Sequence, residues 1–261
     1  MQIYLAAQPH KLRQGCKVVE DVKKAEEGGL GETIKVILQA LVLAVVVRTF
    51  LFQPFTIPSG SMIPTLLVGD YLFVSKYTYG YSKYSMPLSP DLFEGRIWEG
   101  EPKRGDIAVF RLPSNTEIDY IKRVIGLPGD TVQMKDGKLF LNGEAVKTEP
   151  AGMYQHPDGG PQVPMFTETL DNGVSYNTID ANRRGQGDNT QVFEVPPGHY
   201  FMMGDNRDNS LDSRFDVGFV PAENFVGPAR TIFFSVADEA HPLAIWRWPS
   251  DMRTDRLFKG L

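Results

Sequence analysis

The chain contains a single cysteine, Cys16, among its 261 residues. It can therefore form neither an intrachain disulfide nor a cluster of thiolate ligands around a metal ion. Its four histidines are scattered, without the i, i+4 spacing or the acidic neighbours of a zinc site. They are His10, His156, His199 and His241. We therefore expect no metal and no other cofactor.

An excess of basic residues is also missing. The chain has 27 lysines and arginines against 32 aspartates and glutamates, and its formal net charge is -5. Proteins that neutralise nucleic-acid phosphates need the opposite balance, so we expect no nucleic-acid partner. No internal repeat is visible. With 42% apolar and 23% charged residues, the chain can bury a core as one large or two modest domains.

One long apolar run is present, TIKVILQALVLAVVVRTFLFQPF. As a helix, Ile34 to Phe52 would be about 28 Å long, close to the ~30 Å hydrocarbon core of a bilayer. Lys35 can extend to the interface at one end, whereas Arg48 needs headgroups or a partner. A helix buried in a soluble core is the alternative. A cleaved signal peptide fits poorly, because the run follows a charged arm and no small-x-small site comes after it. We predict a transmembrane helix over residues 33–53.

Charges beside this run predict its orientation. No lysine or arginine occurs from Gln53 to Ser75, whereas the preceding arm is rich in them. The basic residues of the arm include Lys11, Arg13, Lys17, Lys23 and Lys24. The positive-inside rule then places the arm, residues 1–32, in the cytoplasm and the rest of the chain on the outer side of the membrane.

The remainder of the chain has strand patterns. Short β-branched or alternating runs are separated by Gly, Pro, Asn and Asp turns, without a βαβ rhythm. Asp-Gly and Asn-Gly pairs predict hairpins near residues 135–146 and 168–180. We predict a mainly β fold: an antiparallel sheet or partial barrel over residues 54–133 and 196–261 forms the catalytic region. A smaller β region is inserted at residues 134–195.

The stretch PSGSMIPTL follows the apolar run directly. Its prolines, serines and glycine are typical of a simple turn, but a rigid loop is also where a serine nucleophile can be held. A serine hydroxyl needs a base near neutral pH, usually histidine or a desolvated lysine. The chain has no G-x-S-x-G elbow. Among the histidines, His199 is the strongest candidate for the base, and an ordinary strand-edge histidine is the simpler interpretation.

A lysine candidate lies in DYIKRVIGLPGD. Lys122 has apolar neighbours on both faces of a predicted strand, although strand lysines often lie at solvent-facing edges. To accept a proton near pH 7, its pKa must fall from about 10.4 by roughly 2 to 4, which burial among apolar groups can achieve.

The stretch GDNRDNSLDSRF is dense in polar side chains. It resembles a calcium loop but lacks the glycine at position six and the glutamate at position twelve. A solvated loop is a second possibility. We favour a buried polar network in which Arg214 pairs with Asp212 and Ser210 holds the lysine amine.

Five ordered stretches resemble the sequence boxes of bacterial type I signal peptidases, which are membrane-anchored Ser-Lys proteases. The stretches are SGSMIPTL after FTIP, GDYLFVSKYTYG, RGDIAVF, DYIKRVIGLPGD and GDNRDNSLDSRF. The resemblance runs from about Thr33 to Ser235. The chain departs from some relatives in having one apparent span instead of two. It also has no cysteine with which to form an extracytoplasmic disulfide.

The resemblance implies a role for each matching residue. Ser61 is the nucleophile, Lys122 is its general base, and Ser59 donates to the oxyanion beside the Ser61 backbone N–H. Ser210 orients Lys122, and Asp212 and Arg214 form a supporting ion pair. The implied substrate-binding residues are Phe55 and Ile57, which line shallow subsites for small side chains, and Met62.

The implied function is removal of signal peptides from exported preproteins at small-x-small sites, in the bacterial inner membrane with the catalytic domain on its periplasmic side. Membrane lipid and the translocation machinery are the further partners. Trp246 and Trp248 are either an interfacial aromatic anchor or ordinary packing residues. Two alternatives remain: a specialised Ser-Lys processing peptidase, and a catalytically silent membrane-anchored β-domain that binds secreted partners. Self-cleaving repressors use the same chemistry, but they carry a DNA-binding domain where this chain has Ile34 to Phe52.

Overall fold

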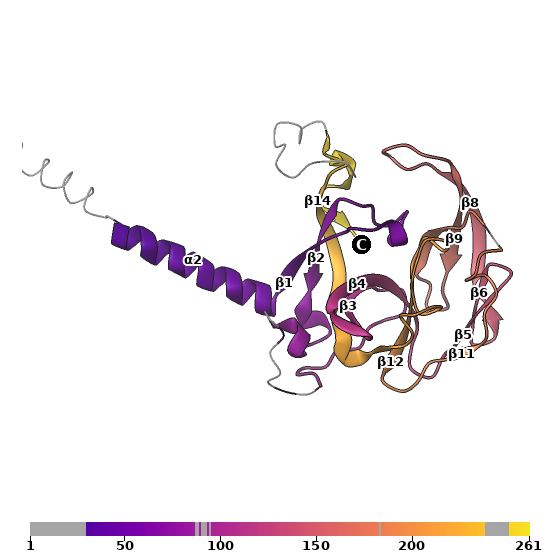
Figure 1. Cartoon of the computed structure of the whole chain (residues 1–261), viewed down its shortest axis with the longest axis horizontal. Coiled ribbons are helices and arrows are strands. Elements are labelled where there is room, and N and C mark those ends of the chain that lie inside the picture. Colours follow the sequence, from indigo (N-terminus) through magenta and orange to yellow (C-terminus); the bar gives the residue numbers. More distant parts are fainter. Residues whose placement is uncertain (1–29, 87–88, 90–92, 94, 183, 238–250) are drawn as a thin grey trace, which may run out of the picture. The chain divides into compact units, whose positions relative to one another are not determined.

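The computed structural model describes residues 30–86, 89, 93, 95–182, 184–237 and 251–261 (Figure 1). The arm before Leu30 and the two tryptophans Trp246 and Trp248 lie outside the described residues. The chain divides into two compact units, Met1–Val47 and Arg48–Leu261.

Helix α2 (Leu30–Phe50) contains most of the apolar run. An apolar window within it has a mean hydropathy of 2.0, and none of that window is buried, so the helix is long and apolar enough to cross a membrane. A core helix of a soluble protein would be mostly buried. The helix begins three residues before Thr33, with Glu32 in its first turn, where a carboxylate interacts favourably with the helix dipole. It ends before Phe52 because the next residues form a strand.

The large sheet has eight strands, and all of its neighbouring strands are antiparallel. In spatial order they are β1 (Phe52–Thr56), β2 (Asp70–Ser75), β14 (Phe225–Ser235), β3 (Ile107–Leu112), β4 (Asn115–Gly126), β12 (His199–Met203) and β13 (Val220–Pro221), with β15 (Lys259–Gly260) paired to β14. This path of strands is open, so the described residues form no closed barrel. The prediction of a mainly antiparallel β fold preceded by one apolar helix is confirmed.

Two smaller sheets are formed by the chain between β4 and β12. One has the order β11 (Phe193–Glu194), β5 (Thr131–Lys135), β6 (Lys138–Leu141) and β7 (Glu144–Ala145). The other has the order β10 (Ser175–Ile179), β9 (Val163–Thr169) and β8 (Lys147–Tyr154). Hairpins lie at both predicted places, and Asp136 and Gly137 take positive φ between β5 and β6. Because β5 begins at Thr131, we propose that the inserted region predicted over 134–195 starts three residues earlier.

Five short 3-10 turns complete the described elements: η1 (Gly60–Met62), η2 (Lys76–Thr78), η3 (Lys83–Ser85), η4 (Ala222–Asn224) and η5 (Thr254–Arg256). The turn η1 carries Ser61, the predicted nucleophile. Its Met62 side chain is fully buried in the core beneath the large sheet, together with Leu66 and Leu72. This apolar anchor holds the serine-bearing turn against the sheet.

Candidate active site

Ser61 and Lys122 meet at the centre of the site. Lys122 lies on β4, and its Nζ is 2.7 Å from the Oγ of Ser61, which is 61 positions away in the sequence. The same Nζ is 3.1 Å from the Ile121 carbonyl oxygen. Both side chains are buried, with exposed fractions of 6% for Ser61 and 4% for Lys122. The structure thus brings the two residues into hydrogen-bond contact.

The environment of Lys122 favours the neutral amine. Burial lowers the pKa of Lys122 from 10.5 to about 8, against the opposing influence of the Asp212 and Asp205 carboxylates. The Tyr120 ring also lies near the amine, 5.2 Å from Nζ to the ring centroid. An amine with a pKa near 8 is partly unprotonated at neutral pH and can accept a proton from a hydroxyl.

Ser59 lies on the solvent side of the nucleophile. It is exposed, and its Oγ is 3.5 Å from the Ser61 Oγ. No carboxylate of the described residues accepts a hydrogen bond from either hydroxyl, so the Ser59 hydroxyl can turn toward a group that docks at Ser61. Such a hydroxyl can donate to an oxyanion.

Asp212 and Arg214 form a buried ion pair close to the dyad. Arg214 Nε donates to Asp212 Oδ1 at 2.9 Å, and its Nη2 donates to Oδ2 at 2.9 Å. Burial alone would raise the pKa of Asp212, but the Arg214 charge and hydrogen bonds and the Gly204 N–H hold that pKa below its usual value. The Asp212 carboxylate therefore stays charged beside Lys122.

Ser210 is buried in the loop after β12 that also carries Asp212 and Arg214. A Cβ built on Gly204 would lie 2.2 Å from the Ser210 Oγ and 2.5 Å from the Ser61 carbonyl oxygen, so only glycine fits between them. The Ser210 hydroxyl helps to lower the pKa of Asp212, but among the described residues the Ser210 Oγ makes no hydrogen bond of normal geometry. Its role in orienting Lys122 stays a prediction.

The three predicted substrate-binding residues share one core cluster. Phe55 is half-buried, Ile57 is 3% exposed, and Met62 is fully buried. Met62 can therefore support a subsite only from beneath, whereas Phe55 retains a surface that a substrate could touch.

Several residues around Ser61 and Lys122 were not predicted from the sequence. Asn206 joins the polar loop to the nucleophile turn: its N–H donates to the Ser61 carbonyl oxygen and its Nδ2 donates to the Gly60 carbonyl oxygen, both at 3.1 Å. Arg123, next to Lys122, makes a two-pronged ion pair with Asp205 at 2.8 and 2.6 Å. The sequence held a signal for them, because Asp205 and Asn206 both belong to the polar GDNRDNS stretch.

The two histidines in the described part of the chain lie away from this chemistry. His199 is 2.9 Å from the Pro197 carbonyl oxygen through Nδ1, and His156 contacts the Asp158 N–H. Neither hydrogen-bonds to Ser61 there. The titratable side chain in contact with Ser61 is the amine of Lys122.

A group of three aspartates, Asp180, Asp188 and Asp208, has ligand oxygens within 4.8 Å of one another. Asp208 accepts hydrogen bonds from two backbone N–H groups, those of Ala181 and Asn182. Burial raises the pKa of Asp188, and the nearby Asp208 charge adds to that effect. The group contributes no side chain to the Ser61–Lys122 contact.

Comparisons with known proteins agree on one family. A family model described as signal peptidase, peptidase S26, matches residues 30–234. The signal peptidase I of Rickettsia typhi is 42% identical over 238 residues, covering 84% of this chain and 89% of that protein. That of Rickettsia akari is 41% identical over 239 residues, covering 84% and 88%. A crystal structure of a signal peptidase I from Enterococcus faecalis V583 has 31% identity, covers 49% of this chain and 96% of that one, and gives a TM-score of 0.31.

Proposed function

Because the chain belongs to the signal peptidase, peptidase S26, family, it is a serine endopeptidase that removes signal peptides, and we propose that Ser61 and Lys122 are its catalytic dyad. Preprotein signal peptides are the substrates of this family. The contact of 2.7 Å between Lys122 Nζ and Ser61 Oγ is the observation that carries the proposal.

The reaction follows from that contact. Neutral Lys122 takes the Ser61 hydroxyl proton while Oγ attacks the scissile carbonyl carbon, and the carbonyl electrons move to its oxygen. The resulting Lys122 ammonium then protonates the leaving amine, the C–N bond breaks, and the acyl-enzyme remains on Ser61. A water molecule, deprotonated by the same amine, releases the signal peptide and restores the serine.

The developing oxyanion needs donors on the solvent side of Ser61. The Ser59 hydroxyl, 3.5 Å from the Ser61 Oγ, and the Ser61 backbone N–H are the proposed pair. One such donor is typically worth about 3 to 4 kcal/mol of transition-state stabilisation. The Asp212–Arg214 pair supports the loop that carries Ser210 and keeps a negative charge near the Lys122 ammonium when it forms.

The proposed small-x-small specificity rests on the walls next to Ser61. Ile57 is nearly fully buried and Phe55 half-buried, and both pack in the core cluster of Met62, so we propose that they offer a substrate only shallow subsites. Large side chains would collide with these walls, whereas alanine would fit.

We propose that membrane lipid is a partner of both units. Helix α2 and the related signal peptidases fit a single-pass protein of the inner membrane. In the second unit, an exposed aromatic cluster includes Phe52, Phe73 and Tyr77, and Phe73 stacks on Phe233 with ring centroids 4.2 Å apart. Aromatic side chains of this kind favour the lipid interface. Association with the translocation machinery stays a prediction, which in-membrane crosslinking would test.

The dyad can be tested with a preprotein and the detergent-solubilised full chain. We expect Ser61→Ala and Lys122→Ala each to lower the rate of signal-peptide removal by at least about 10³-fold, because nucleophile and base act as a unit. Lys138→Ala, which removes an exposed lysine of β6, should cleave at the wild-type rate. Gel mobility of the processed product measures all three.

Two results would contradict the proposed dyad or the proposed activity. Processing that survives the loss of Ser61 or of Lys122 would assign the chemistry to other residues. A wild-type chain that binds the preprotein without cleaving it would favour the silent β-domain.

A further inference from the structure

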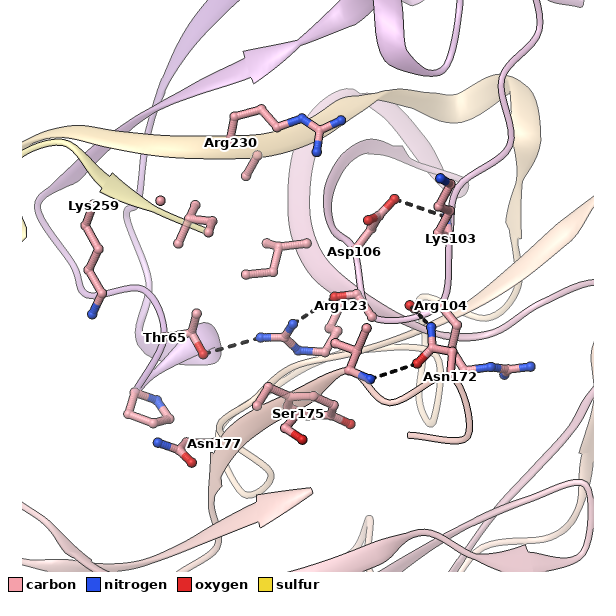
Figure 2. A pocket seen from close by; sticks show the side chains of 18 residues that line it. Thr65, Lys103, Arg104, Asp106, Arg123, Asn172, Ser175, Asn177, Arg230 and Lys259 are labelled. Carbon is pink, nitrogen blue, oxygen red and sulfur yellow. Dashed lines mark hydrogen bonds between the residues drawn. The ribbon is translucent and has the colours of Figure 1, made fainter. Parts of the chain in front are cut away.

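A hollow of about 570 Å³ lies beside the nucleophile turn (Figure 2). Its walls include Pro64 and Thr65 just after that turn, Arg123 on β4, and residues 175–177 of β10. It is much larger than a single side chain. Three or four residues of an extended chain would fit in it.

The hollow is basic in a protein of net charge -5. Arg104 and Arg123 are neutralised by aspartates outside the hollow. Lys103, Arg230 and Lys259 also line it, and in the described part of the chain no carboxylate forms an ion pair with them. Asp106 is the one acidic side chain among the lining residues. The hollow is therefore suited to an anionic guest.

One wall of the hollow is an unpaired strand edge. β10 is the outermost strand of its sheet: in the described part of the chain one edge pairs with β9, and the other is bridged only at Ile179, by Asn206. At Ile179 the backbone groups point away from β9: its N–H donates to the Asp205 carbonyl oxygen, and its carbonyl oxygen accepts from the Arg207 N–H. Because backbone groups alternate in direction along an antiparallel strand, those of Asn177 and Ser175 also point outward. No backbone hydrogen bond satisfies them among the described residues, and both residues line the hollow.

One short segment of chain separates this free edge from Ser61. The segment Asp205 to Arg207 bonds to Ile179 on one side, and within it the Asn206 N–H donates to the Ser61 carbonyl oxygen on the other. A chain that leaves Ser61 past this segment therefore meets Asn177 first and Ser175 next. The cations Lys103 and Lys259 lie around the same space (Figure 2).

We propose that this hollow binds the mature part of the preprotein, on the carboxyl side of the cleaved bond, as an extended strand added to β10, and that it favours acidic side chains there. The inference rests on the proposed function, because it needs Ser61 as the point of cleavage. A peptide explains both features of the site. The strand edge takes a peptide backbone, and the unpaired cations take its carboxylates.

The charge preference can be tested with two synthetic substrates that share a signal-peptide end and differ only after the cleavage site. One carries glutamate and the other glutamine at the second to fifth positions of the mature part. We expect kcat/KM to be about three- to tenfold higher for the glutamate peptide, since exposed ion pairs contribute up to about 1 kcal/mol each. The ratio should approach one in 0.5 M salt.

The protein side of the test uses the double variant Lys103→Gln/Lys259→Gln. We expect it to lower the ratio of glutamate to glutamine peptide cleavage to nearly one. Lys138→Gln, an exposed lysine on β6 outside the hollow, is the matched control and should keep the wild-type ratio. Thermal unfolding followed by circular dichroism checks that each variant is folded.

The strand addition has a separate signature that leaves the protein unchanged. N-methylation of one peptide amide at a time along the mature part should reduce kcat/KM at every second position, by about three- to tenfold for each lost hydrogen bond. Equal loss at all positions, or none, would overturn the strand addition.

The outcomes separate this inference from the proposed function. If the glutamine peptide is cleaved and the glutamate peptide is cleaved no better, the hollow does not bind the mature chain, while the peptidase assignment stands. If the double variant lowers cleavage only in vesicles containing anionic lipid, the hollow binds a headgroup and the inference is wrong. If wild type cleaves neither peptide, both proposals fail.

Discussion

Two lysines of the described residues are buried, Lys76 and Lys122. Burial lowers the pKa of each to about 8. Lys76 Nζ donates to the Ser85 carbonyl oxygen, whereas Lys122 Nζ contacts a hydroxyl. A lowered pKa is therefore not sufficient to identify the base. The contact with Ser61 distinguishes the two.

The pKa of Lys122 predicts how activity depends on pH. The amine acts as a base only when it is unprotonated, so kcat/KM should rise with pH and level off above about 8. Initial rates on a short peptide between pH 5 and 10 measure this. A profile that rises near pH 6.5 and is flat from 7 to 9 would instead indicate a histidine base.

The same burial predicts a gain in stability when the amine is removed. The pKa of Lys122 is about 8 in the folded chain and 10.5 when unfolded, so burial opposes folding fully below pH 8, and this effect fades as the pH rises to 10.5. At pH 6, Lys122→Met should raise the free energy of unfolding by about 1 to 3 kcal/mol while abolishing activity. Denaturant titration followed by circular dichroism measures it.

A matched exposed substitution is the control for that gain. Lys138→Met should leave the free energy of unfolding nearly unchanged, because that side chain is in water in both states. If Lys122→Met left the free energy of unfolding unchanged or lowered it at pH 6, the amine would be charged and well solvated in the folded protein.

Residue chemistry made part of the site predictable. A serine on a stiff turn and a lysine between apolar neighbours suggest nucleophile and base, and the structure brings Ser61 and Lys122 together. Arg123 and Asn206 were not predicted, because their importance depends on partners 82 and 145 positions away. A single sequence does not show which of its many polar residues will contact one another in the folded chain.

At the scale of the elements, the loop after β12 is built around one close approach. Gly204 packs against Ser210 and the Ser61 carbonyl oxygen, so a methyl group there must displace either the turn that carries Ser61 or the loop that carries Gly204. We expect Gly204→Ala to lower kcat by about 10²-fold, the effect of a displacement near 1 Å in a catalytic pair. Peptide cleavage in detergent is the assay.

Gly31→Ala provides the comparison, since a Cβ at Gly31 meets nothing within 4 Å. It should retain wild-type activity in the same assay. Full activity of Gly204→Ala would mean that the loop can retreat without moving Ser61.

Element types were predicted better than element ends. Hairpins follow from local Asp-Gly and Asn-Gly pairs, because the turn chemistry is contained in two residues. The end of α2 was predicted beyond Phe52 because phenylalanine and leucine suit a helix as well as a strand. Pairing of Phe52 with Ser75 on β2 decides for the strand, and that pairing is tertiary information.

At the scale of the whole molecule, the order of the strands in space was beyond prediction. β14 lies between β2 and β3 although about 150 residues separate it from β2. Antiparallel pairing over such a distance leaves no local pattern in the sequence. The general architecture of one apolar helix followed by a β body was predictable, since hydropathy and alternation are summed over many residues.

The sole cysteine allows a test of orientation. The arm that carries Cys16 should be cytoplasmic, because its lysines and arginines favour that side. In intact spheroplasts, a membrane-impermeant maleimide should leave Cys16 unlabelled and react only after lysis. Gel shift of the purified chain measures the labelling.

A second variant tests the part of the chain that is predicted to lie on the outer side of the membrane. Met153→Cys in a Cys16→Ser background places a thiol on exposed β8, and it should react in intact spheroplasts. The reverse pattern would place the Ser61–Lys122 pair in the cytoplasm, where exported precursors have not yet crossed.

If the predicted orientation holds, the buried amine of Lys122 faces a medium that the cytoplasm does not buffer. The proton on Lys122 would then exchange with that medium, and below pH 8 each further unit of acidification would leave about one tenth as much unprotonated amine. A cell that acidifies its habitat would slow the release of its own secreted proteins. Precursors would then accumulate, still tethered to the bilayer, until neutrality returned.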